Sequence, residues 1–191
     1  MEAGEARERV KILSLAEGDG ALRWEETRMT WAKVEETGAR NLFSSVGLAA
    51  GTVMLTIRRQ ALGLDQMLEW KGQRLFITAI TPRSRDSGWL EVTTGKVRVL
   101  DCVTKRRGPV KAPLPSLCFP GVLTEKYQGY DPGKAQAEVT STYVLVTPKT
   151  VELAVGDVYA AAGMEGAYNV TACHILDQYK NEYEATWRRD A

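Results

Sequence analysis

The sequence predicts an all-β protein made of two small antiparallel β-barrel or sandwich domains in tandem. Three observations support this prediction. Short β-prone runs recur between turn-forming residues, a proline-rich stretch divides the chain, and the second half echoes the first at an offset of about 90 residues. We therefore expect a first domain over residues 1–103, a proline-rich and basic linker over 104–116, and a second domain over 117–191.

The first half reads as a succession of strands. The run 10–15 is β-prone and is closed by turn residues at 17–20, and a second strand region extends from Trp24 to Val34. In the run 53–58, apolar and mixed residues alternate with a period of two, which is typical of a half-buried antiparallel strand. The apolar row of that strand is Val53, Leu55 and Ile57.

Two hairpins are predicted to complete the first domain. Lys71 to Gln73 forms a tight turn between the runs 67–70 and 74–80. A second turn at 84–88 precedes the run 89–94. The first half is therefore expected to be two strands, an excursion and a meander.

The excursion spans residues 38–51, where we expect the β pattern to break. Leu42, Phe43 and Val46 have helical spacing, but Gly47 and Gly51 limit any helix to about two turns. Apolar side chains on such a loop need a partner to cover them. The sequence therefore predicts a partner-binding loop, with the interface residues Leu42, Phe43, Val46 and Leu48.

The stretch 104–120 has four of the seven prolines of the chain, so neither a regular helix nor a central strand is expected there. Beyond it, four β-prone runs form a second predicted meander. These runs are 141–147, 156–159, 168–173 and 183–187.

The echo between the two halves joins three pairs of segments. They are 65–67 with 157–159, 76–79 with 169–172, and 91–93 with 184–186. Duplication of one domain is one interpretation of this pattern. The other is that β meanders share turn chemistry without common descent.

Composition excludes several classes of function. The net charge is +1, from 25 Lys and Arg against 24 Asp and Glu, so any contact with DNA must be local. The apolar runs are far shorter than the ~20 residues that cross a bilayer, and we expect no membrane partner. Three scattered cysteines fit neither a disulfide framework nor a metal pair, which favours synthesis in a reducing cytoplasm.

No motif predicts an enzyme. His174 is the single histidine of the sequence, and its neighbour Cys173 faces the other side of a regular strand, so the two cannot pair as base and nucleophile. Nucleotide-binding, zinc-protease and nucleophile-elbow signatures are missing from the sequence. We expect no catalytic residue, no cofactor and no metal.

Tryptophans and basic residues supply the remaining candidates. Trp31, Trp70, Trp89 and Trp187 are expected in barrel cores, whereas Trp24 has charged neighbours and is a candidate interface residue. Lys105, Arg106, Arg107 and Lys111 form a basic cluster, which we interpret as a solvated linker or as the lining of a DNA channel.

Residues 4–94 resemble the bacteriophage head-tail joining family, also called head-closure, adaptor or stopper proteins. The resemblance rests on the opening 4–12, on Trp31 to Val34, and on the segments 53–58 and 69–77 with their spacers. It implies a virion protein of the phage neck, made in the cytoplasm of the bacterial host. In this family the loop between the second and third strands reaches toward a neighbouring subunit or ring.

The resemblance implies a homo-oligomeric ring, six- or twelve-fold, that retains packaged DNA between the portal or adaptor proteins and the tail. Six two-domain chains would present twelve similar modules. Two other functions remain open: a tail-completion or tail-terminator protein that binds tail tube protein, and a nucleic-acid-binding β-barrel protein. Contact with packaged DNA is expected to be non-specific.

Overall fold

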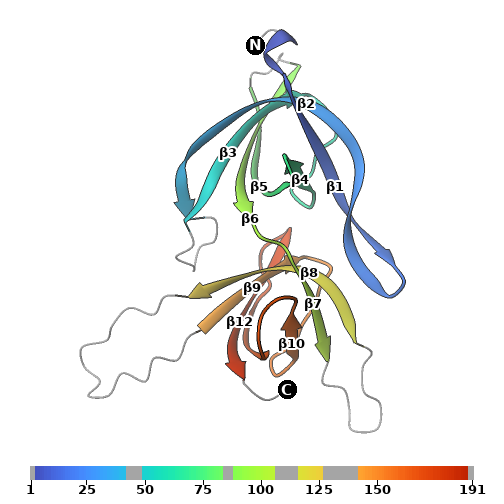
Figure 1. Ribbon diagram of the computed structural model, residues 1–191, viewed down its shortest axis with the longest axis vertical. Coiled ribbons are helices and arrows are strands. Elements are labelled where there is room, and N and C mark those ends of the chain that lie inside the picture. The colour runs from blue at the N-terminus through green and yellow to red at the C-terminus, as the bar shows by residue number, and fades with distance from the viewer. Residues whose placement is uncertain (1–2, 42–48, 84–87, 106–115, 127–141, 189–191) are drawn as a thin grey trace, which may run out of the picture. The chain divides into compact units, whose positions relative to one another are not determined.

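The computed structural model describes residues 3–41, 49–83, 88–105, 116–126 and 142–188, and confirms the all-β class. The chain divides into two compact units: the first takes most of residues 1–98, and the second takes Val99–Ala191 together with short segments of the first half that include Asp19–Ala21 (Figure 1). We call them the first and the second barrel. A single 3-10 turn, Ala3–Glu5, precedes the strands. Among the described residues, no helix is long or apolar enough for a membrane span.

In the first barrel, six strands are found among the described residues, and their pairing order, β1-β4-β5-β6-β3-β2, closes through a further β1–β2 pairing. The pairs β1–β4, β4–β5, β5–β6, β6–β3 and β3–β2 are all antiparallel. The strands are β1 (Glu8–Gly18), β2 (Ala21–Asn41), β3 (Ala49–Arg58), β4 (Met67–Trp70), β5 (Gln73–Pro82) and β6 (Trp89–Val97).

Period-two burial builds the core of the first barrel. Val53, Leu55 and Ile57 of β3 are fully buried, as the alternation in their sequence predicts. Trp70 is also a core residue, so the core prediction for this tryptophan is confirmed. Further members of this cluster are Val10, Ile12, Ala32, Leu68, Leu75, Ile77, Leu90 and Val92.

The second barrel repeats this strand order. Its described strands pair as β8-β7-β10-β11-β12-β9 and close through β8–β9, so that adding six to each strand number of the first barrel gives the neighbours in the second. The strands are β7 (Leu100–Lys105), β8 (Leu117–Lys126), β9 (Thr142–Pro148), β10 (Val158–Ala161), β11 (Ala167–His174) and β12 (Lys180–Arg188). Its interior is richer in tyrosine: Tyr159, Tyr168 and Tyr183 are almost completely buried.

Two local features recur at equivalent places. A bulge between β5 and β6 falls at Thr78, and a bulge between β11 and β12 falls at Thr171. Each threonine hydroxyl donates a hydrogen bond to a carbonyl across the bulge, at 3.0 Å to Thr93 and at 3.1 Å to Glu184.

The second recurring feature is the turn before β4 and before β10. The backbone N–H of Gln66 bonds the carbonyl of Gly63, and the Gln66 side chain accepts a bond from the Gly63 N–H. Asp157 and Ala154 make the same reciprocal pair. Equal strand order with equal bulges and turns is what duplication of one domain would produce.

The segment pairs of the echo need adjustment. The match of 76–79 with 169–172 agrees with the strand register. In contrast, Glu91 is equivalent to Glu182 rather than Glu184, and Gln66 rather than Asp65 is equivalent to Asp157. The sequence comparison misaligned these two pairs because it used nearly the same residue offset along both halves, although the loops of the two barrels differ in length.

The predicted domain limits were wrong in one respect. Residues 100–105 form β7 of the second barrel, so the predicted linker 104–116 starts within β7 and continues between β7 and β8, and it does not lie between the domains. Pro120 lies within β8 and pairs with Asp101. The pairing with β9 begins at Val122, beyond the proline, so the missing N–H of Pro120 removes no bond to that strand.

The predicted break at 38–51 was also too wide. β2 continues to Asn41 and β3 starts at Ala49, where these two residues still pair. The glycine of the pair Ala39–Gly51 is accommodated in the ladder next to a bulge. Residues 42–48, with the predicted interface side chains Leu42, Phe43, Val46 and Leu48, lie outside the described residues.

Candidate interaction surface

A groove of about 660 Å³ opens on the surface of the first barrel. The strands β2, β3 and β6 and the residues before β1 contribute to it. It is lined by Ala6, Arg7, Met29, Thr30, Trp31, Arg58 and Trp89. A smaller hollow beside it adds Arg9.

Strand alternation places these side chains on the outside of the barrel. Ile57 and Leu90 face the core and are register partners, so the next pair along, Arg58 and Trp89, faces outward together. Trp31 likewise alternates with the fully buried Ala32.

The groove exposes an unusual amount of apolar surface. Met29 is 54% exposed and Trp31 is 53% exposed. The core prediction for Trp31 was therefore wrong, because the inward position belongs to the small side chain of Ala32. Single exposed apolar residues are ordinary, but adjacent large ones in a concave surface mark a binding site.

An arginine guanidinium group lies over the ring of each tryptophan in the groove. The Arg9 guanidinium lies 5.2 Å from the centre of the Trp31 ring, and that of Arg58 lies 5.9 Å from the Trp89 ring. Such cation–π contacts contribute about 0.5–1 kcal/mol at exposed sites and hold both side chains in one orientation.

The groove has a positive local charge. Within the described part of the chain, none of the guanidinium groups of Arg7, Arg9 and Arg58 lies within ion-pair distance of a carboxylate. Arg7 donates from Nε to the carbonyl of Gly4 at 2.8 Å. These charges are therefore available to an anionic group of another molecule.

A hydrogen bond stabilises the floor of the groove. Gln60 Nε2 donates to Thr30 Oγ1 at 3.0 Å, which ties β2 to the segment after β3. The backbone N–H of Arg59 donates to the carbonyl of Gly88 at 2.8 Å, next to Trp89. These two bonds tie β2 and the residue before β6 to the segment that follows β3.

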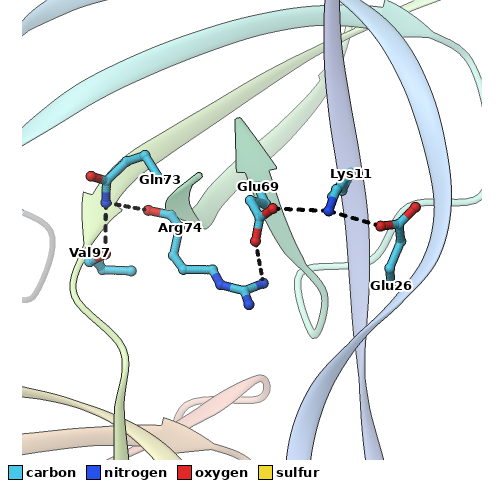
Figure 2. A network of polar contacts seen from close by, with 6 residues as sticks. All are labelled: Lys11, Glu26, Glu69, Gln73, Arg74 and Val97. Carbon is cyan, nitrogen blue, oxygen red and sulfur yellow. Dashed lines mark hydrogen bonds and ion pairs between the residues drawn. The ribbon is translucent and has the colours of Figure 1, made fainter. Parts of the chain in front are cut away.

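Elsewhere in this barrel, four charged side chains form a network of ion pairs (Figure 2). Lys11 Nζ lies 3.2 Å from Glu26 Oε2 and 3.3 Å from Glu69 Oε1, and Arg74 Nη1 lies 3.1 Å from Glu69 Oε2. Lys11 donates hydrogen bonds to the carboxylates of Glu26 and Glu69, and these bonds, that to Glu26 first, raise the pKa of Lys11. This network connects β1, β2, β4 and β5.

The other predicted residues are spread over the chain. Trp24, the candidate interface tryptophan, is half-buried in β2. Lys105 is the last residue of β7, whereas Arg106, Arg107 and Lys111 lie outside the described residues. Trp187 is 44% exposed, so its core prediction was wrong, and its Nε1 donates to the carbonyl of Glu165 at 2.9 Å.

The titratable groups of the second barrel are dispersed. His174 is exposed and lies 3.1 Å from Glu184 Oε1. Burial raises the pKa of the Cys102 thiol to about 12 and also raises the pKa of Cys173. Among the described residues, no group of three or more His, Cys, Asp and Glu side chains lies close enough to hold a metal ion.

Comparison with known proteins adds no assignment: no protein-family model matches the sequence, and no significant match was found among curated proteins. The fold and the groove define an all-β protein with a basic, tryptophan-lined groove as its candidate interaction surface.

Proposed function

We propose that this chain is a structural protein of the phage neck, which assembles into a ring between portal and tail and helps to retain packaged DNA. The observation that carries the proposal is the groove between Trp31 and Trp89. Trp, Arg and Met are the residue types enriched in protein interfaces, and Trp and Arg dominate their binding energy.

Two further observations support this function. The resemblance to head-tail joining proteins covers the barrel that bears the groove. The β2–β3 hairpin stays paired to Asn41 and Ala49, and the sequence between them contains Leu42, Phe43, Val46 and Leu48. The groove is thus one candidate contact surface, and the apolar sequence of 42–48, which lies outside the described residues, is predicted to supply another.

The two barrels differ at the groove. By strand register, the second barrel has Pro120 where the first has Trp31, and Pro148 where the first has Arg58. We interpret the barrels as divergent repeats in which one copy kept or acquired the binding surface. Each chain then has one such groove, on its first barrel, with which to bind a neighbour.

The test of the proposal is the mass of the assembled particle. We expect the purified chain, alone or with portal protein, to form a closed ring that native mass spectrometry resolves as six or twelve copies. Phe43→Asp should leave the melting temperature of the monomer unchanged and abolish the ring. A chain that stays monomeric with portal, adaptor and tail proteins would contradict the function.

Binding partners distinguish the closest alternative, a tail-terminator role. Pull-down with portal protein supports a place at the head side of the neck, whereas pull-down with tail tube protein alone supports the tail side. Each experiment needs Trp31→Ala as a matched variant, because loss of the groove should weaken true binding.

A second candidate function is nucleic-acid binding, which the Arg and Trp side chains of the groove favour. Single-strand binders stack bases on exposed aromatic rings and lose affinity steeply with salt. Here Arg9 and Arg58 already lie over the rings. Salt-dependent binding of single-stranded DNA by the monomer, lost in Trp31→Ala, would favour this function over the neck role.

A further inference from the structure

We infer that the groove of the first barrel binds the turn of the β1–β2 hairpin of a second copy of this chain, and that this contact joins subunits head to tail. The inference rests on the proposed ring function. It goes further because it names both faces of the subunit contact.

The end of the β1–β2 hairpin has unpaired negative charges, whereas the groove has unpaired positive charges. Glu17, Asp19 and Glu25 are exposed near the β1–β2 turn, and within the described residues none of them has an ion-pair partner. Arg23 is the neighbouring exposed cation. Glu26 is already paired with Lys11, so the unpaired carboxylates belong to the outer end of the hairpin.

The hairpin end also has apolar side chains to offer. Leu15, Leu22 and Trp24 are half-buried beside the turn. Contact with Trp31, Met29 and Trp89 would remove apolar surface from water on both sides.

The hairpin of a chain cannot reach the groove of that same chain. Arg9 and Glu17 lie on the unbroken strand β1, and eight residues at 3.3 Å per residue separate them by roughly 26 Å. Figure 1 shows the turn at the end of the β1–β2 ribbon that is remote from the N-terminus. The acidic end and the basic groove thus occupy opposite ends of one ribbon.

Opposite ends of one element give a heterologous contact. In such a contact, the patch of one subunit binds a different patch of the next, and the repeat closes into a ring when the rotation allows it. A two-fold contact of groove on groove, or of hairpin end on hairpin end, would place like charges against each other, which is unfavourable. Charge complementarity therefore selects a contact between groove and hairpin end, and the proposed ring function favours its head-to-tail form over a reciprocal two-fold pair.

Two variants with reversed charge test the contact. The groove variant carries Arg9→Glu and Arg58→Glu, and the hairpin variant carries Glu17→Lys and Glu25→Lys. Asp19 stays unchanged because its φ of 53° is unfavourable for most residues. Circular dichroism and a thermal melt establish that both variants fold.

Analytical ultracentrifugation then measures assembly of each variant. Each alone should associate at least about tenfold more weakly than the natural chain, since like charges meet at every contact. An equimolar mixture should regain assembly, because opposite charges then meet at every contact between the two variants. The acidic hairpin end of the groove variant meets the basic groove of the hairpin variant, and the basic hairpin end of the hairpin variant meets the acidic groove. The chain with all four substitutions should also regain it.

Arg98→Glu and Glu165→Lys are matched controls at exposed positions outside both faces, and they should assemble normally. A natural chain that forms rings, with both reversed variants forming them equally well, would overturn the inference and leave the proposed function intact. A groove variant that fails while the hairpin variant assembles normally would also overturn it, and would favour a separate acidic protein as the occupant.

Discussion

Thr78 and Thr171 occupy the same position in the two barrels, each at a bulge and each bonded to a carbonyl of the next strand. A bulge leaves backbone groups partly unpaired, and a threonine hydroxyl can satisfy one of them. The identical solution in both halves supports a common origin.

Replacing either threonine tests whether the two bulges matter equally. Thr78→Val and Thr171→Val should each lower the free energy of unfolding by about 0.5–1 kcal/mol, because both bonds are exposed and neutral. Urea denaturation measures the difference. An effect at one site and none at the other would contradict equivalence of the bulges.

The groove and the core should respond differently to truncation. Trp31→Ala should change the free energy of unfolding by at most about 1 kcal/mol, since the ring is half exposed. Leu55→Ala, in the core of the same barrel, should cost about 2–5 kcal/mol. Thermal denaturation of both variants checks this; equal losses would make Trp31 a core residue.

Tyr183 links the second barrel to the loop before β10. Its hydroxyl donates to the Val151 carbonyl at 2.8 Å and accepts from the Leu153 N–H at 3.1 Å. Tyr183→Phe should cost about 1–3 kcal/mol, because the Leu153 N–H is left buried without its acceptor. The matched variant Tyr179→Phe, at an exposed tyrosine, should be neutral in the same urea titration.

Gly121 lies where two side chains leave no room. A Cβ built there would lie 2.7 Å from Leu145 Cδ1 and 3.2 Å from Cys102 Sγ. Gly121→Ala should therefore cost about 1–3 kcal/mol through overpacking. Gly88→Ala, where nothing lies within 4 Å, is the control, and a stable Gly121→Ala protein in a thermal melt would refute this packing.

Cys102 should be inert in the folded protein. Burial raises the pKa of its thiol to about 12, so the thiol is protonated and unreactive at pH 8, well below that value. A Cys118→Ser, Cys173→Ser protein should react with a disulfide reagent at pH 8 only after unfolding. Rapid labelling of the native protein would show that the second barrel opens easily.

Sequence predicted the first barrel well for a physical reason. Its strands alternate with a period of two, and its hairpins have short turns such as Lys71–Gly72, both with positive φ. β4 was predicted over the residues where it is found, 67–70. Local rules suffice where the turn and the strand agree.

The second barrel and the groove were harder to predict. Pro120 made β8 hard to predict, because a proline is permitted where a strand lacks a neighbour on one side, and only the pairing pattern reveals that place. β7 contains no proline, but its last two residues were assigned to the proline-rich stretch that follows it. The groove was missed because tryptophan was assumed to be core. Alternation about Ala32 and Leu90 indicates that Trp31 and Trp89 face outward.

Each described strand of both barrels has a neighbour on either side, which limits how the protein can meet other molecules. A sheet with a free margin can recruit a foreign strand through its unused amides, and this is a common route to uncontrolled aggregation. A closed circuit gives no such template. Growth of any assembly must then proceed through side-chain recognition, which is reversible and stops when its specific sites are filled.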